Sequence, residues 1–152
     1  MHKVVADPAP FPVRSKTGEK FINNISTIAS GISFADKIVL TICQNGRLAH
    51  WVQIPLSNPH PDQVPPASFE TDLDAPQSDL LPAPHLTTST LLGGTAPERE
   101  TAGQLVATQI GSLLLKQRPE EQRTLVVGIG FQNAQLSSDE FAELVDLGLS
   151  ML

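Results

Sequence analysis

Two glycine pairs are the residues of this sequence that come nearest to ligand chemistry. The first, Gly93-Gly94, lies in LLGGTAPERE, and glycines between a strand and a helix can cradle a phosphate. A Walker-type loop also needs a lysine to meet the phosphates, and this stretch has none. Glu98 and Glu100 fall in the first turn of the expected helix, where carboxylates occupy the positive end of the helix dipole and repel a phosphate. The stretch therefore predicts a turn and a helix start instead of a nucleotide site.

The second pair, Gly128 and Gly130, imitates the start of the dinucleotide-binding motif GxGxxG. The third glycine is missing, and both glycines lie inside an apolar strand-like run, ahead of any helix. In the dinucleotide motif the glycines form the turn between a strand and the helix that follows it. A nucleotide-binding α/β unit is therefore not expected here.

Cys43 and His50 are the residues that could act as a nucleophile and its base. In the hairpin expected around Asn45-Gly46, His50 lies opposite Thr41, so the thiol and the imidazole would be only diagonal neighbours. A lone cysteine in an apolar run is more often buried and inert. The four histidines lack the HxH or HExxH spacing of a metal site, and a single cysteine excludes a thiolate zinc site.

These observations favour a protein that is not an enzyme and that needs no cofactor or metal. The alternative is a small-ligand-binding or regulatory domain, with a pocket near His50, Trp51 and Cys43. The net charge of −6 argues against nucleic acid or an anionic membrane as a partner, since both attract clustered positive charge. The sequence shows no long apolar core of a signal peptide and no run long enough to span a membrane. We therefore expect a cytoplasmic protein, which can also enter the nucleus.

The 152 residues suit a single domain with one core. Residues 1–12 contain three prolines and read as a flexible leader, and the domain occupies 13–152. Residues 21–34 predict a strand with Gly31 as a bulge. Residues 55–84 hold eight of the thirteen prolines and several Asp and Glu residues, which predicts a disordered insertion.

The firmest local signal is KIVLTICQNGRLAHWVQI, two strand-like runs that flank Asn45-Gly46. A two-residue turn there pairs Gln44 with Arg47 and Leu40 with Trp51. This register puts Leu40 and Trp51 on one face of the hairpin, and both faces are substantially apolar. We expect one face to be covered by the rest of the domain and the other to meet something else.

The C-terminal half predicts a strand, a helix, a second strand and a closing helix. HLTTSTLLGG is rich in hydroxyls on both faces, which suits an edge strand. Thr95 and Glu98 form a capping box for a helix that ends near Gln117, and Ser137 with Glu140 forms another. Between the helices, RTLVVGIGF is a near-continuous apolar strand, and we expect a small-residue strip of the first helix to pack on its flat face at Gly128 and Gly130.

The order of these features is similar to the proteasome assembly chaperone 3 family. The resemblance rests on the hairpin, LTTSTLLG with the acidic-capped helix after it, and the strand TLVVGIGF, over about 13–54 and 85–152. It would make the chain a fungal-like member with an extra proline-rich acidic loop. It implies a non-enzymatic chaperone that pairs with the related assembly chaperone 4. The pair would bind proteasome alpha subunits, notably the fifth, during alpha-ring formation.

Taken together, these patterns predict one α+β domain with an antiparallel sheet of about six strands and two main helices packed on it. Apolar surface beyond the needs of one small core indicates a protein that binds other proteins. We expect its partner contacts in the hydroxyl-rich strand and the acidic helix start. The candidate residues are Thr87, Thr88, Ser89, Thr90, Glu98 and Glu100.

Overall fold

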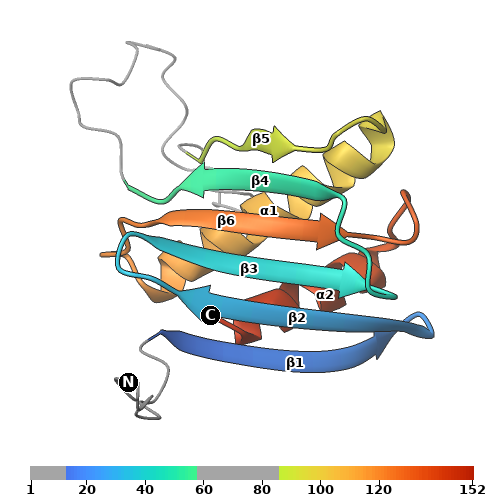
Figure 1. Cartoon of the computed structure of the whole chain (residues 1–152), viewed down its shortest axis with the longest axis horizontal. Coiled ribbons are helices and arrows are strands. Elements are labelled where there is room, and N and C mark those ends of the chain that lie inside the picture. The colour runs from blue at the N-terminus through green and yellow to red at the C-terminus, as the bar shows by residue number, and fades with distance from the viewer. Residues whose placement is uncertain (1–12, 58–85) are drawn as a thin grey trace, which may run out of the picture.

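One six-stranded sheet with two helices forms the protein, as the sequence predicts (Figure 1). The computed structural model describes residues 13–57 and 86–152, so the expected leader and almost all of the expected insertion lie outside the described residues. The elements are β1 (Arg14–Ile22), β2 (Ile25–Ser33), β3 (Lys37–Gln44), β4 (His50–Pro55), β5 (Ser89–Leu92), α1 (Pro97–Gln117), β6 (Thr124–Gly130) and α2 (Ser138–Ser150). The strand order is β1-β2-β3-β6-β4-β5, and every neighbouring pair is antiparallel except β3 and β6.

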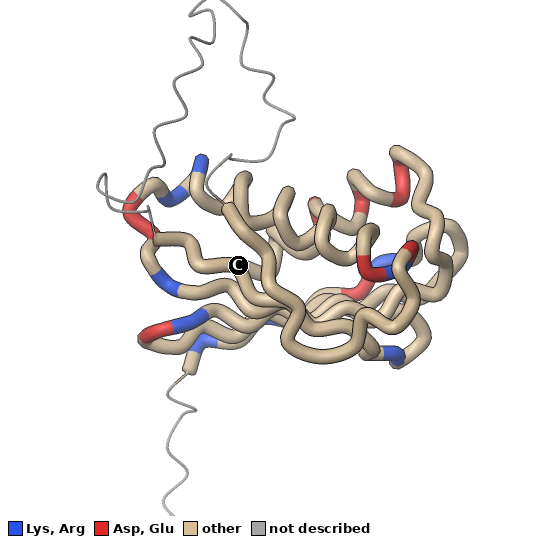
Figure 2. The backbone as a smooth tube through the Cα atoms, turned by 90° about the horizontal axis from the view of Figure 1, so that it is seen from above, with Lys and Arg blue, Asp and Glu red and all other residues tan. Residues whose placement is uncertain are grey.

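Both helices lie on the same side of the sheet, which gives the domain two layers (Figures 1 and 2). The core fills the space between the layers. Its fully buried large side chains come from four strands, both helices and the residue after β4: Ile22, Leu40, Ile42, Val52, Ile54, Leu56, Val106, Ile110, Leu114, Leu125, Val127 and Leu144. Neither of the two helices in the described ranges is long and apolar enough to cross a bilayer.

The N-terminal part of the sheet is a hairpin, where the sequence pattern suggested one strand over 21–34. β1 and β2 pair along their whole length, and the turn between them is Asn23-Asn24. Both asparagines have positive φ, at 49° and 60°, a conformation that asparagine tolerates better than most residues. The predicted bulge at Gly31 is wrong, because the pairing on both sides of β2 runs through Gly31 without a break.

The strand β6 lies between β3 and β4, so the predicted hairpin closes only at its tip. Gln44 and Arg47 form the expected bridge around Asn45-Gly46. The predicted pairing of Leu40 with Trp51 is wrong, because Leu40 pairs with Val127 of β6 and Trp51 pairs with Gly128. The physical reason is that β6 follows the helix α1, and a connection of this length lets it return parallel to β3 and leave its other edge to β4.

Because β6 lies between β3 and β4, the buried face of β4 is the opposite of the predicted one. Val52 and Ile54 are fully buried with Leu40, while Trp51 lies on the opposite face of the sheet, away from the helices. The flat face of β6 is covered by Trp51 and not by α1 as predicted. The strip of small residues on α1 packs instead on the face of β6 that carries Ile129. The Ile129 Cδ1 lies 3.4 Å from the place that a Cβ on Gly103 would take.

The two helices begin in different ways. At α2 the predicted capping box is confirmed, since Ser137 Oγ accepts from the Glu140 N–H and the Glu140 carboxylate accepts from the Ser137 N–H. At α1 the predicted box is wrong, because the N-cap is Ala96 and no side chain caps the helix. Thr95 precedes the N-cap by one residue. The Glu100 carboxylate accepts a hydrogen bond from Thr90 instead of capping the helix. The predicted end of α1 near Gln117, before Pro119, is confirmed.

Candidate protein-interaction site

The face of the sheet opposite the helices, which we call the open face, carries large apolar side chains. Strand alternation and register place one set of residues here, because their neighbours in each strand point into the core. Phe21, Ile28 and Leu92 are 68%, 41% and 67% exposed. The partly exposed members of the open face are Ile32, Val39, Cys43, Trp51 and Val126.

Hydroxyl groups are interleaved with these apolar residues. The hydroxyls of Thr17 and Ser30 are hydrogen-bonded at 2.9 Å, and the Thr41 hydroxyl lies beside them, 3.5 Å from the Ser30 carbonyl oxygen. Toward one end, Ser26 donates to the Glu19 carboxylate at 2.7 Å. A mixed surface of this kind, apolar with small polar groups that already have partners, matches the composition of protein–protein interfaces.

Trp51 occupies a defined place on the open face. Three atoms of its six-membered ring lie 2.7–2.8 Å from the position that a Cβ on Gly128 would take, so the indole rests directly on the glycine. Gly128 therefore serves packing, where its sequence suggested a nucleotide motif. Tryptophan is enriched among the residues that dominate binding energy at interfaces. Trp51 is also the only tryptophan of the chain, which makes it a spectroscopic reporter of this face.

Two of the six residues predicted to contact a partner, Thr90 and Glu100, are brought together by the structure. Thr90 Oγ1 donates to Glu100 Oε1 at 2.9 Å, lies 3.2 Å from His50 Nε2, and is 3.3 Å from the amide nitrogen of Gln104. Thr90 pairs with Val52 across the sheet, so this cluster lies on the helix side of β5. Of the other four predicted residues, Thr87, Ser89 and Glu98 are exposed and Thr88 is half-buried at the edge of the sheet.

His50, Trp51 and Cys43, where the alternative interpretation expects a pocket, do not all share one face of the sheet. His50 is buried on the helix side, whereas Trp51 and Cys43 lie on the open face. Burial lowers the pKa of His50, which Glu100 partly offsets, and burial raises the pKa of the Cys43 thiol. Within 13–57 and 86–152, no three His, Cys, Asp or Glu residues are grouped so that they could hold a metal ion.

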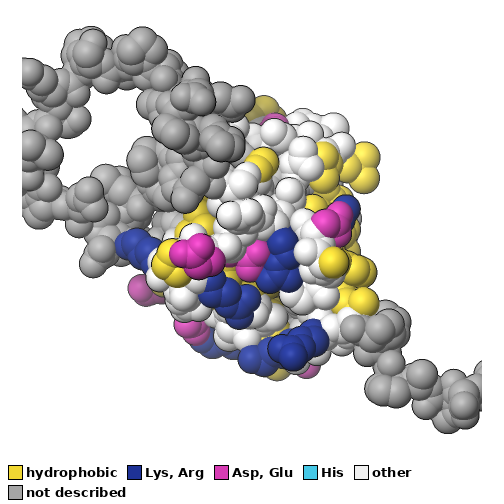
Figure 3. Space-filling model, turned by 90° about the vertical axis from the view of Figure 1, so that its left-hand side faces the viewer, with side chains coloured by type: hydrophobic (Ala, Val, Ile, Leu, Met, Phe, Trp, Pro, Cys, Tyr) yellow, Lys and Arg dark blue, Asp and Glu magenta, His cyan; other side chains and the backbone are white. Residues whose placement is uncertain are grey.

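A groove at the opposite edge of the molecule, with a volume of about 610 Å³, was not anticipated from the sequence. It lies where β1 begins, where α1 ends and where the last residues of the chain return to the sheet. We call it the basic groove, since Arg14, Lys16, Arg118 and Arg123 line it together with Ile32, Ile38, Met151 and Leu152. Figure 3 shows several Lys and Arg side chains on this end of the molecule, with Asp and Glu side chains among them.

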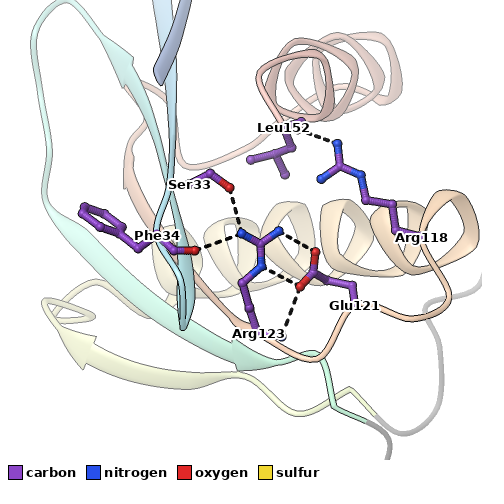
Figure 4. Close-up of polar contacts among 6 residues, drawn as sticks. All are labelled: Ser33, Phe34, Arg118, Glu121, Arg123 and Leu152. Atoms are coloured by element: carbon purple, nitrogen blue, oxygen red, sulfur yellow. Dashed lines mark hydrogen bonds and ion pairs between the residues drawn. The ribbon is translucent and has the colours of Figure 1, made fainter. Parts of the chain in front are cut away.

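Arg123 ties the loop between α1 and β6 to the end of β2 (Figure 4). Its guanidinium donates two hydrogen bonds of 2.7 Å to the Glu121 carboxylate, one of 2.8 Å to Ser33 Oγ and one of 3.0 Å to the Phe34 carbonyl. The Glu121 side chain is only 8% exposed. The hydrogen bonds from Arg123 lower the pKa of Glu121 to about 2, so this pair is a strong structural tie.

The Glu121–Arg123 pair predicts a specific acid sensitivity. The pKa of Glu121 is depressed in the folded state, so its contribution to stability is complete above about pH 4.5 and is lost as the pH falls toward 2. After allowance for the partial exposure of Arg123, we expect this contribution to be about 2 kcal/mol. Urea unfolding between pH 7 and 3 should show the loss, and Arg123→Gln should lower stability at pH 7 and flatten the pH dependence.

The ion pair between Lys20 and Glu143 provides the matched control for this experiment. It spans 3.0 Å, but both side chains are more than 40% exposed, so solvent screens it. Lys20→Gln should therefore change the free energy of unfolding by less than about 0.5 kcal/mol and leave its pH dependence intact. An Arg123→Gln protein with the wild-type acid profile would contradict the assignment.

Comparisons with known proteins place the fold. No family model matches the sequence, and no curated protein matches it significantly. Among solved structures, a match is found to a chain of a yeast protein, described as the "Crystal Structure of a Novel Chaperone Complex for Yeast 20S Proteasome Assembly". The superposition covers 88% of this chain and 95% of that chain, with a TM-score of 0.53 and 15% sequence identity. The two chains share a fold.

At this identity, the likeness concerns the arrangement of strands and helices and not the identity of individual side chains. The match covers nearly the whole of the yeast chain, so both chains share the arrangement of a sheet with helices packed on it.

Proposed function

We propose that this protein is a non-enzymatic chaperone for assembly of the 20S proteasome core particle. It would pair with a related chaperone similar to assembly chaperone 4 and bind alpha subunits, notably the fifth, while the alpha ring forms. It would act in the cytoplasm, and in the nucleus where the ring is assembled there. Two independent lines support the proposal: the sequence pattern of the assembly chaperone 3 family, and a fold shared with a chain of a yeast proteasome assembly complex.

The single observation that carries a binding role is the open face. A sheet with helices on one side only must either present polar residues on the other side or cover it with a partner. Here Phe21, Ile28 and Leu92 are exposed on that side, and Trp51 lies on the same face, paired with Leu92 across the two strands. Exposed apolar surface rimmed by polar residues marks a protein-interaction site. We assign this face to the paired chaperone, whose own sheet would cover it.

The edge strand β5 and the start of α1 lie beside the open face and carry the hydroxyl and acidic residues predicted for partner contact. Leu91 and Leu92 are more than half exposed next to Ser89 and Thr90. β5 pairs with β4 on one side only, so its other edge has unpaired backbone groups. We propose that Thr87, Thr88, Ser89, Thr90, Glu98 and Glu100 form the part of the surface that an alpha subunit contacts.

Affinity purification of the tagged protein from native extract, read by mass spectrometry, tests the function. The expected result is recovery of a related chaperone of similar size together with proteasome alpha subunits, at levels well above those of mature core particles. A tagged protein that carries Ile28→Asp should lose the chaperone partner. Recovery of neither partner with the wild-type protein would overturn the proposal.

A further inference from the structure

The basic groove carries positive charge that the described residues around it neutralise only in part. It holds four of the ten Lys and Arg residues of a chain whose net charge is −6, and no Asp or Glu is among the described residues that line it. Arg123 is matched by Glu121. Of the other three cations, Arg118 lies near enough to Glu121 for its charge to help lower the pKa of that carboxyl, whereas Arg14 and Lys16 have no ion pair with a described carboxylate.

Two of these three cations donate hydrogen bonds to main-chain oxygens, and the third does not. Lys16 donates to the Ser150 carbonyl at 2.7 Å, and Arg118 donates to the main-chain oxygen of Leu152 at 2.7 Å (Figure 4). Arg14 is exposed at the start of β1 and has no hydrogen bond or ion pair to a described residue. The Ser150 carbonyl orients Lys16 but leaves its charge available to an anion.

The floor of the groove is apolar and is closely packed. Ile32 and Ile38 come from β2 and β3, and Met151 and Leu152 from the segment after α2. The main-chain oxygen of Met151 lies 2.3 Å from the place that a Cβ on Gly31 would take, so only glycine lets this segment lie on the sheet. The groove thus has an apolar floor and a rim of cations, most of which are oriented by hydrogen bonds.

We propose that the basic groove binds an acidic segment of another protein, in which an apolar side chain lies between carboxylates. The carboxylates would meet Arg14, Lys16 and Arg118, and the apolar side chain would cover Ile32 and Met151. Charge complementarity selects this occupant, because an arginine presents a planar fork of donors that matches a carboxylate. The groove shares Ile32 with the end of the open face, whereas Arg118, Met151 and Leu152 lie outside that face.

Fluorescence anisotropy with a labelled peptide, GDELDEG, tests the proposal on the full chain. We expect saturable binding that weakens as the salt is raised from about 0.05 to about 0.5 M, because salt screens exposed charges. The amide version GNQLNQG should bind at least about tenfold more weakly, since each lost charge contact has a small but additive effect. Equal binding of the two peptides would overturn the proposal.

Charge reversal at the rim locates the site. Arg14→Glu should weaken GDELDEG binding about fivefold, because one attraction is replaced by a repulsion. Arg47→Glu, in the turn at the other end of β3, makes the same change in net charge and should leave the affinity unchanged. An equal loss in both variants would show attraction to the whole molecule and would overturn the site.

Chemical-shift mapping on the unmodified protein gives a second measurement that depends on no variant. Addition of GDELDEG should shift the backbone amide signals of Gly31, Ser33, Met151 and Leu152. The signals of Ile28 and Cys43, farther along the open face, should stay in place. Shifts confined to the open face would overturn the assignment of the groove.

Discussion

Replacing Ile28 with aspartate is expected to weaken pairing with the proposed partner chaperone at least about a hundredfold, while the protein itself stays folded. Ile28 lies on β2 in the inner part of the open face, 41% exposed, between Glu19 of β1 and Cys43 of β3. A carboxylate at this point would have to lose its water without gaining a cation, and truncation of a central interface residue alone costs about 2–4 kcal/mol. A hundredfold loss of affinity corresponds to about 2.7 kcal/mol.

The measurement is a titration with the purified partner, followed through the fluorescence of Trp51. The chain has one tryptophan and no tyrosine, so its emission reports the open face directly. Leu105→Asp is the matched control, because Leu105 is an apolar residue 51% exposed on α1, in the other layer of the domain. A partner that binds Ile28→Asp as tightly as the wild type would have to bind elsewhere than on the open face.

Replacing Gly130 with alanine is expected to destabilise the fold by about 3 kcal/mol, at the upper end of what overpacking costs. A Cβ on Gly130 would lie 1.7 Å from the main-chain oxygen of Arg47 and 2.8 Å from the Leu48 nitrogen. Main-chain atoms cannot rotate away as the end of a side chain can. The chain around 47–48 must therefore move as a whole, and with it the hydrogen bond from the Ala49 N–H to the Ile129 carbonyl.

The same substitution at Gly111 should have the opposite sign. Gly111 is buried in the middle of α1, and a Cβ there would lie 3.4–3.7 Å from Leu86, Leu56 and Ile54, at ordinary contact distances. Alanine in a helix interior is favoured over glycine by about 0.5–1 kcal/mol. Urea unfolding of the two variants should thus separate them by about 4 kcal/mol. A Gly130→Ala protein as stable as the wild type would show that the loop does not press on β6.

The parts of the fold that were predictable from the sequence are those set by neighbouring residues. Ser137 and Glu140 satisfy each other within one helical turn, and Pro119 stops α1 because proline cannot continue a helix. The exposed edge strand β5 follows from its run of hydroxyls. The tip of the hairpin at Asn45-Gly46 follows from turn chemistry, and the bridge of Gln44 to Arg47 confirms it.

The parts that were not predictable depend on residues far apart in the chain. Nothing near Leu40 or Trp51 indicates that a strand more than seventy positions later separates them, and this insertion decides that Trp51 faces outward. The same holds for the basic groove, where Arg14 and Arg118 meet only because α1 returns to the start of β1. Among the open-face residues, Ile28 and Ile32 share a face by simple alternation along one strand, whereas the place of Phe21 depends on the turn at 23–24.

The central place of β6 governs how the chain can acquire this structure. β3 and β4 are synthesised first and each holds one edge open until β6 arrives, after the whole of α1 has been made. Contacts between such distant segments are slow to form, because the chain loses the entropy of loop closure before strand pairing can stabilise it. A nascent chain that lacks Thr124–Gly130 therefore consists of two separate ribbons with unpaired strand edges, which are prone to aggregate. We therefore expect the unpaired edges of β3 and β4 to need protection until β6 has been made.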